Sequence, residues 1–319
     1  MDALAPNRSR TVTWQDPAEL RCAAHDLTGL ELLHRIASQQ LPPPPVADLI
    51  GFAPTFVSPG LVVFTYEPRE EHYNALGFVH GGIVTTILDT AMSCAVHSEL
   101  QVGVAYATVE LKTSFVRPVT FGGRVTPRRG PGRPFRKTDR DRGGQAPRRG
   151  GHGLRELDLD EHDPRRPPRA AGGIVSLHVE LSGLETIKAI FAGELPPPPI
   201  AELMGFTGVE VELGHAVFEF EPGPQHYNPI GSVHGGVAMT LLDSAMGCAI
   251  HSTLAAGVRY TTLEVKTNFV RAMTVETGLV RCEGTVLHSG SRIATAEGKV
   301  VDANGKLLAH GTTTCLILG

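Results

Sequence analysis

The chain has 319 residues, of which 41% are hydrophobic and 19% charged, and its formal net charge is −4. This composition excludes wholesale disorder, and the length fits one large domain or two ordinary ones. The slightly negative balance predicts no general affinity for nucleic acid or for acidic membranes, so neither is expected as a partner. No apolar run approaches the roughly 18 residues of a membrane helix, and residues 1–10 lack the apolar stretch of a secretory signal.

The cysteines are few and scattered, and no two of them form a Cys-x-x-Cys pair. An odd number at irregular spacing is typical of free thiols in a reducing compartment, so we expect a cytoplasmic protein without disulfides. The histidines show no zinc-binding spacing, so no metal is expected. The five cysteines are Cys22, Cys94, Cys248, Cys282 and Cys315.

An internal repeat organises the chain. The segment that begins Leu41-Pro-Pro-Pro-Pro recurs, with conservative changes, at Leu195-Pro-Pro-Pro-Pro, an offset of 154 residues. At the same offset, Glu71–Pro118 matches Gln225–Ala272 at 28 of 48 positions without a gap. The period is too long for a solenoid unit, so it indicates a duplicated small domain.

The first copy is expected at residues 28–125, after an N-terminal extension of residues 1–27. It opens with a helical pattern at residues 29–36, which the four prolines after Leu41 stop. It then follows the plan of the second copy until about Val125. The first unit is therefore predicted to be truncated.

Residues 126–173 do not fit either copy. They contain no Val, Ile, Met, Tyr, Trp or Cys, and residues 124–169 hold 13 of the arginines together with seven prolines and seven glycines. Three interpretations compete: a disordered basic linker, a nucleic-acid-binding arm, and a stretch read in the wrong frame.

The third interpretation can be tested on paper and is the one we favour. Degenerate codons for the segment that starts at Phe135, read one base later, can encode Ser-Gly-Arg-Arg-Ile-Ala-Thr-Ala-Glu-Gly-Lys. The second copy has Ser289-Gly-Ser-Arg-Ile-Ala-Thr-Ala-Glu-Gly-Lys299, so ten of eleven positions agree at the offset of 154. Roughly residues 126–170 are thus expected to be out-of-frame sequence, natural or erroneous, in which case the basic run has no selected chemistry.

The second copy, residues 174–319, has the clearer pattern of elements. A helix at 183–190 is followed by a short strand at 216–221, and then by an apolar and therefore buried helix at 235–251. Alternating segments predict four further strands, the last two joined by the hairpin dipeptide Asn304-Gly305. The order predicts an α+β fold in which an antiparallel sheet wraps one helix. The four expected strands are 260–271, 279–288, 292–302 and 306–318.

Each copy contains the pattern Asn-x5-His-Gly-Gly-x6-Asp. Its His-Gly-Gly opens the predicted buried helix, where unpaired N–H groups and the positive end of the helix dipole suit an oxygen that gains negative charge. The glycines allow a ligand to approach the backbone, and the Asp lies about two turns further on among apolar residues. Burying an unpaired carboxylate among apolar residues costs free energy, so its presence there calls for an explanation. The residues are Asn74, His80, Gly81, Gly82 and Asp89, and Asn228, His234, Gly235, Gly236 and Asp243.

Each of these residues alone has an ordinary explanation. The glycine pair could form a tight turn, the His could cap the helix, and the Asp could lie on a thin exposed edge of the helix. The combined spacing on a strand–turn–buried helix–strand frame favours a functional site over these separate explanations.

The segments Tyr73–Gly82 and Tyr227–Gly236, each followed by Leu-Asp-x-Ala, resemble the PaaI-type hot-dog thioesterases. The resemblance covers about residues 50–125 and 200–318. It implies that the two units pair within the chain as a double hot-dog, which we expect to dimerise further. It also implies hydrolysis of acyl-CoA thioesters with water as the second substrate, and with no cofactor other than the coenzyme A of the substrate.

The resemblance assigns roles residue by residue. The backbone N–H of Gly81 or Gly235 would polarise the thioester carbonyl, and Asp89 or Asp243 would act as general base or nucleophile. The two asparagines would hold the water or the thioester, and the two histidines would shape the turn and contact the sulfur. A Thr on the strand after the helix would support the water, at Thr108 and Thr262.

Because the family's sites lie across the pair, the resemblance implies composite sites. Residues 228, 234 and 235 would then act with Asp89 and Thr108, and residues 74, 80 and 81 with Asp243 and Thr262. Arg117 and Arg271, at the ends of the predicted central strands, are candidates for binding the CoA phosphates. Two rivals remain: a hot-dog enoyl-CoA hydratase or dehydratase, and a non-catalytic or degenerate acyl-CoA-binding protein.

Overall fold

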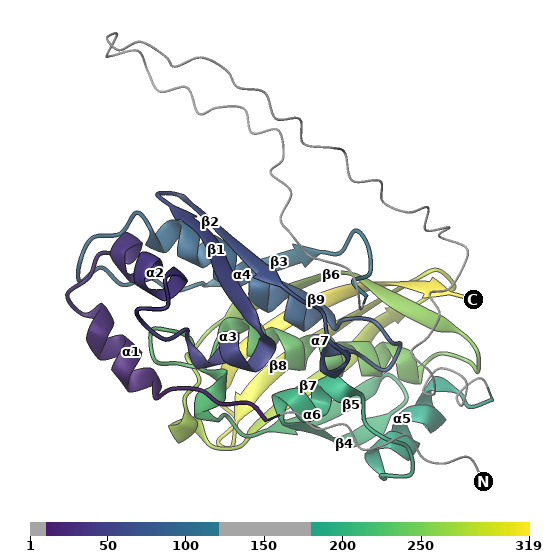
Figure 1. Ribbon diagram of the computed structural model, residues 1–319. Coiled ribbons are helices and arrows are strands. Elements are labelled where there is room, and N and C mark those ends of the chain that lie inside the picture. The colour runs from purple at the N-terminus through teal and green to yellow at the C-terminus, as the bar shows by residue number, and fades with distance from the viewer. Residues whose placement is uncertain (1–10, 121–179) are drawn as a thin grey trace, which may run out of the picture.

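A computed structural model describes residues 11–120 and 180–319 of the chain. The basic segment and the proposed frameshift, residues 126–170, lie outside the described residues, as does the expected truncation point near Val125. Figure 1 shows the two copies packed side by side, with the central helices of both units near the middle of the molecule. Among the described helices, none combines the length and the apolar character that crossing a bilayer requires.

The second copy is a sheet wrapped around one long helix. The helix, α7, is buried on nearly every side, which agrees with its apolar sequence. A Cβ on Gly284 would fall 2.4 Å from the Ala245 backbone, so glycine lets the helix lie directly on the sheet. The elements are α5 (Gly183–Phe191), α6 (Pro199–Met204), β4 (Phe206–Glu212), β5 (His215–Phe220), η2 (Pro224–His226), α7 (Gly235–Ser252), β6 (Arg259–Phe269), η3 (Val275–Thr277), β7 (Val280–Ser289), β8 (Ile293–Asp302) and β9 (Leu307–Leu318).

Three details of the predicted order are corrected. The prediction lacks β4, which pairs with β5 at the edge of the sheet. The alternation of apolar and polar residues in β4 is weak, because its exposed positions carry glutamates and Val209. The four prolines end one helix but also begin α6, since Pro199 occupies its first turn. The central strand β6 ends at Phe269, so Arg271 lies beyond it rather than within it.

The first copy repeats the plan of the second as far as its described residues go. In the predicted N-terminal extension, α1 packs through Leu20 against the face of α2 that carries Leu32 and Ile36. The strand β3 ends at Ser114, so Arg117 also lies beyond its strand. The elements are α1 (Pro17–Ala24), α2 (Gly29–Ala37), α3 (Pro45–Ile50), β1 (Phe52–Ser58), β2 (Leu61–Tyr66), η1 (Glu70–His72), α4 (Gly81–His97) and β3 (Glu110–Ser114).

The strands of the two copies join along β3 and β6. In the described chain the larger sheet runs β3-β6-β9-β8-β7-β5-β4, while β1 and β2 form a separate hairpin. In the antiparallel pairing of β3 with β6, Lys112 lies opposite Lys266, and these two positions are 154 residues apart. A pseudo-twofold axis therefore passes through this pair, and the predicted intrachain pair of hot-dog units is confirmed.

The short helices after the prolines fasten each copy to the other. The Val46 N–H at the start of α3 donates to the Tyr227 carbonyl at 3.2 Å, and the Ile200 N–H at the start of α6 donates to the Tyr73 carbonyl at 3.2 Å. Tyr73 and Tyr227 directly precede the Asn of the repeated pattern. Each of these hydrogen bonds therefore holds the loop before the central helix of one copy against the short helix of the other copy.

The central helices cross at their N-terminal turns. A side chain on Gly82 would collide with Thr240 of the other helix, and one on Gly236 would collide with Thr86. The second glycine of each His-Gly-Gly therefore serves helix packing, whereas the sequence predicts that it lets a ligand approach the backbone. One hydrophobic core extends from copy to copy through this crossing.

Candidate functional site

The histidine of each pattern caps the helix that it precedes. The Nδ1 atom of His80 accepts a hydrogen bond from the Gly82 N–H at 3.0 Å, and that of His234 accepts one from the Gly236 N–H at 3.0 Å. A ring nitrogen that accepts carries no proton, so we assign the proton of each ring to Nε2. Burial lowers the pKa of both histidines, against the opposing influence of an aspartate of the other copy. Both rings are therefore neutral in the folded protein.

The protonated nitrogen of each ring reaches across to the other copy. His80 Nε2 lies 3.1 Å from the hydroxyl of Ser244, and His234 Nε2 lies 3.0 Å from that of Thr90. Each hydroxyl donates its own hydrogen bond to the helix carbonyl one turn earlier. Both nitrogens of each ring are thus engaged, and the histidines join the copies rather than titrate near neutral pH.

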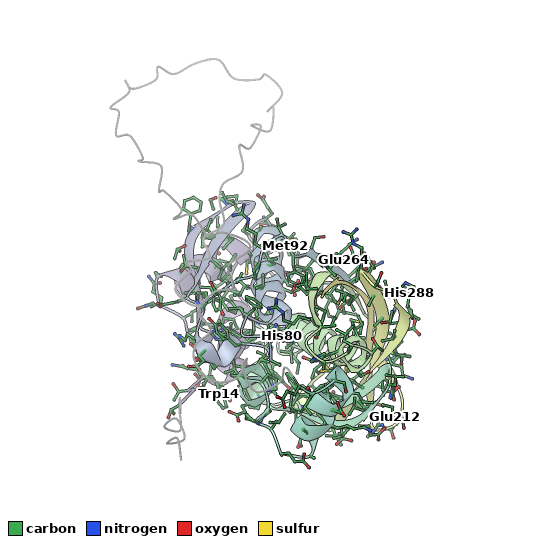
Figure 2. The ribbon with its side chains drawn as sticks, turned by 90° about the vertical axis from the view of Figure 1, so that its right-hand side faces the viewer. Trp14, His80, Met92, Glu212, Glu264 and His288 are labelled. Atoms are coloured by element: carbon green, nitrogen blue, oxygen red, sulfur yellow. The ribbon has the colours of Figure 1, made fainter. Side chains whose placement is uncertain are left out.

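The aspartates lie where the two copies meet, each facing the helix start of the opposite copy. Asp89 and Asp243 are 5% and 7% exposed. Asp243 Oδ2 lies 3.5 Å from His80 Nδ1, and Asp89 Oδ2 lies 3.8 Å from His234 Nδ1. Because Nδ1 is an acceptor and the distances are long, these are proximities and not hydrogen-bonded ion pairs. Figure 2 shows His80 between the two copies.

The other oxygen of each aspartate is bound by a threonine of its own copy. Thr108 donates to Asp89 Oδ1 at 2.9 Å, and Thr262 donates to Asp243 Oδ1 at 3.3 Å. Burial raises the pKa of Asp243, and His80, Thr262 and the Gly82 backbone oppose the shift. A carboxylate with a raised pKa is a stronger base than an exposed one.

The first glycine of each central helix has no side chain, and this leaves space beside the carboxylate of the other copy. A Cβ on Gly81 would fall 2.8 Å from Asp243 Oδ2 and 2.9 Å from the ring of Phe115. At the other site, the ring of Phe269 lies 3.0 Å from the corresponding point on Gly235. Among the hydrogen bonds of the described residues, neither first-turn N–H, of Gly81 or of Gly235, has an acceptor. Each site therefore pairs an acid of one copy with a free backbone donor of the other.

The asparagines do not touch these acids. The side-chain oxygen of Asn74 accepts from the N–H groups of Leu76 and Phe78, and that of Asn228 accepts from Ile230 and Ser232. Each Asn thus builds the turn before the His. The side-chain amide of Asn228 donates to the Ser232 hydroxyl, whereas Phe78 occupies the matching place in the first copy.

Both arginines lie on the surface outside this cluster. Arg117 is exposed, and the guanidinium of Arg271 donates to the Leu307 carbonyl at 2.6 Å. A shallow depression in the second copy, lined by Glu210, Glu212 and His215, includes none of the predicted site residues. In the parts of the chain that the structure describes, no cluster of three or more His, Cys, Asp or Glu is arranged to hold a metal ion.

One site residue was missed in the sequence. Ser93, one turn after Asp89, donates to Asp89 Oδ1 at 3.3 Å and lies 3.2 Å from the Thr108 hydroxyl. The matching position in the second copy is Gly247, where a Cβ would fall 2.7 Å from the hydroxyl of Tyr260. The i, i+4 spacing from the Asp was the available clue. The Asp89 site thus has two hydroxyls at its acid, and the Asp243 site has one.

Comparison with known proteins supports one family. The sequence profile of the thioesterase superfamily matches residues 76–128 and 230–309. A 1,4-dihydroxy-2-naphthoyl-CoA hydrolase of Listeria monocytogenes is 27% identical over 118 residues, 37% of this chain and 94% of that protein. Among solved structures, a phenylacetic acid degradation-related protein of Ralstonia eutropha is 27% identical, with a TM-score of 0.38 over 40% of this chain and 97% of that one.

A protein of Saccharolobus solfataricus that carries an esterase name is 33% identical over 134 residues, 42% of this chain and 94% of that protein. Each relative therefore corresponds in length to about one copy of the repeat. With the two profile matches lying in the two copies, the chain belongs to the thioesterase superfamily as a tandem pair of hot-dog units.

Proposed function

We propose that the chain hydrolyses acyl-CoA thioesters to a free acid and coenzyme A at two composite sites. The observation that supports this most is the facing arrangement: a buried aspartate of one copy lies beside the helix start of the other, where the N–H of the first glycine has no acceptor among the described residues. A free backbone donor can stabilise the negative charge that builds on a thioester oxygen during attack. The neighbouring acid can take up a proton from the attacking water.

In the proposed reaction, the N–H of Gly81 or Gly235 polarises the thioester carbonyl. Asp243 or Asp89 removes a proton from a water molecule, whose oxygen forms a bond to the carbonyl carbon. The carbon–sulfur bond then breaks, and the thiolate of coenzyme A leaves and takes up a proton. Direct attack by the carboxylate is the alternative: it displaces the thiolate of coenzyme A and forms a mixed anhydride that water then hydrolyses. Label found in the aspartate after a single turnover in ¹⁸O-labelled water would identify this route, because proton abstraction from water leaves the carboxylate oxygens unchanged.

The remaining predicted residues receive supporting roles. Thr108, with Ser93 beside it, and Thr262 orient the acid and the water, and the two histidines hold the helix starts. The side-chain amide of Asn74 donates no hydrogen bond within the described residues, whereas that of Asn228 donates to Ser232, so Asn74 is the better candidate of the two for binding substrate. Arg117 and Arg271 are proposed to meet the CoA phosphates at the surface.

The substrate class follows from the family by analogy. One relative is named as a hydrolase of an aromatic acyl-CoA, so aromatic and short-to-medium acyl-CoA esters are the first to test. The phosphate-rich CoA portion would remain at the surface, since Arg117 and Arg271, the arginines proposed to bind it, are exposed.

The test is release of free thiol from a panel of acyl-CoA esters by the full chain. Replacing both Asp89 and Asp243 by Asn should lower kcat/KM at least ~1,000-fold, about 4 kcal/mol of transition-state stabilisation, with an unchanged circular dichroism spectrum. Undiminished turnover in the folded double variant would exclude the assignment. Hydration of enoyl-CoA without thiol release would favour a hydratase, and tight binding without turnover would favour a non-catalytic protein.

A further inference from the structure

The outer face of α4 carries an apolar stripe that nothing in the described structure covers. Leu88, Met92 and Val96 follow one another at four-residue spacing, so they lie on one side of the helix. Their side chains are 43%, 52% and 55% exposed. We call these three residues the bare face; Figure 2 labels Met92 on the first-copy side of the molecule.

The second copy shows what covers the same face when the unit is complete. The counterparts of the bare face, Leu242, Met246 and Ile250, are all 0% exposed. A Cβ on Gly298 of β8 would fall 3.0 Å from both Leu242 and Met246, so this strand crosses directly over the stripe. In β8, Ala294 and Ala296 are also fully buried. Small residues in this strand allow the sheet to lie close to the helix.

Two strand edges of the first copy have no further partner among the described strands. In the second copy, β6 is followed in the sheet by β9 and β5 is followed by β7, with β8 between β9 and β7. In the first copy, β3 pairs only with β6 and β2 only with β1 among the described strands. The unpaired edges of β3 and β2 are therefore the two ends of a gap that three consecutive strands would close.

The sequence at the matching positions identifies which polypeptide fits the gap. Shifting β7–β9 back by 154 gives residues 126–164, and the in-frame residues that match Ala294 and Ala296 are Arg140 and Arg142. Read one base later, the same codons can encode alanine at both positions, within the stretch that agrees with residues 289–299 at ten of eleven places. Arginine toward an apolar helix face would leave a charge unpaired, whereas alanine suits close packing.

We infer that the bare face packs against a three-stranded sheet that is encoded in the shifted frame between about codons 126 and 170. The outer strands of that sheet would pair with the free edges of β3 and β2. Among the described residues of the present chain, the first unit has no strand after β3 and nothing covers the bare face. A chain with the frame restored would place the three strands there and join the hairpin β1–β2 to the larger sheet. This inference needs no assumption about the reaction that the protein catalyses.

The experiment compares three full-length chains by hydrogen exchange and light scattering. The first is the present chain, the second is the same gene with the frame shifted by one base between codons 126 and 170, and the third has residues 280–318 grafted in place of residues 126–164. The second and third chains should exchange the amides of α4 at least ~10-fold more slowly than the first, with α7 unchanged as an internal reference. Met92→Glu should abolish that slowing.

Three results would overturn the inference. In the first, the frame-restored chain is soluble but exchanges the α4 amides at the present rate. In the second, the frame-restored chain fails to fold while the grafted chain folds. In the third, the present chain already protects α4 by self-association, and Met92→Glu both dissociates it and removes the protection, because a second copy would then be the occupant of the bare face.

Discussion

The two central helices have similar sequences, identical at 10 of 17 positions, but different surroundings. Both begin at a His-Gly-Gly, both place an Asp two turns later, and both cross the other through a glycine and a threonine. Yet α7 is enclosed by its sheet, while α4 shows a half-exposed apolar stripe. The comparison separates two tasks. The loop, the helix and the segment that follows it build the acid site, and the last three strands supply the cover. Thr262 lies on β6 as predicted, but Thr108 lies before β3 begins at Glu110, which corrects its predicted place on that strand.

The sites themselves differ in ways that the same comparison reveals. Asp89 is bound by two hydroxyls, whereas Asp243 is bound by one and also lies near Cys315 of β9, whose thiol is 3.9 Å from the Thr262 hydroxyl. The described part of the first copy has no counterpart of β9. The two sites are thus expected to differ in rate even though their acids and backbone donors match.

The largest difference between the copies should appear in a pair of matched truncations. Leu242→Ala removes a fully buried side chain and should lower the free energy of unfolding by about 3 kcal/mol, through lost apolar burial and a residual cavity. Leu88→Ala, at the matching half-exposed position, should cost less than about 1 kcal/mol. Urea titration of both variants measures the difference, and equal losses would show that the Leu88 side chain is also covered.

Acid should destabilise the second copy through a buried histidine. Burial lowers the pKa of His226 from 6.5 to about 4, so the folded state resists protonation that the unfolded chain accepts. Its contribution is present above pH 6.5 and is lost as the pH falls toward about 4, by at most about 3 kcal/mol. His226→Gln should remove that part of the slope of stability against pH, and an unchanged slope would show that other groups cause it.

The extra hydroxyl at the Asp89 site should have a smaller effect. In an Asp243→Asn background, where only the Asp89 site works, Ser93→Ala should lower kcat ~3–10-fold, about 1 kcal/mol, by removing one donor to the acid. The control is Ser93→Ala in an Asp89→Asn background, which should leave the activity of the Asp243 site unchanged. A loss of similar size in the control would indicate a general structural effect instead.

The smallest expected effect concerns the strand pair that joins the copies. Lys112 meets Glu264 at 2.6 Å, and Lys266 meets Glu110 at 3.1 Å, in pairs that the pseudo-twofold axis relates. All four side chains are well exposed, so Lys112→Met and Lys266→Met should each change stability by no more than ~0.5 kcal/mol, and by similar amounts. A large or unequal loss in thermal unfolding would show that the two sides of the β3–β6 pair are not equivalent.

Much of the second copy was readable in its sequence because its patterns are local. The apolar run begins α7 at Gly235 as predicted, and the alternating segments give β7 to β9 within a residue or two. The edge strand β4 was not readable, because its exposed face carries glutamates and an isolated valine that match no clear period. Its place depends on pairing with β5, and on Gly208 lying under the ring of Phe191.

The sequence alone determined the duplication, the elements of the second copy and the residue types that surround each acid, since spacing and periodicity are properties of short segments. The tertiary structure decided which acid meets which helix start, which histidine nitrogen carries the proton, that Ser93 joins one site only, and that the α4 stripe is half exposed. These features depend on contacts between residues far apart in the chain. The free energy of such contacts comes from burial and hydrogen-bond geometry, which no local pattern encodes.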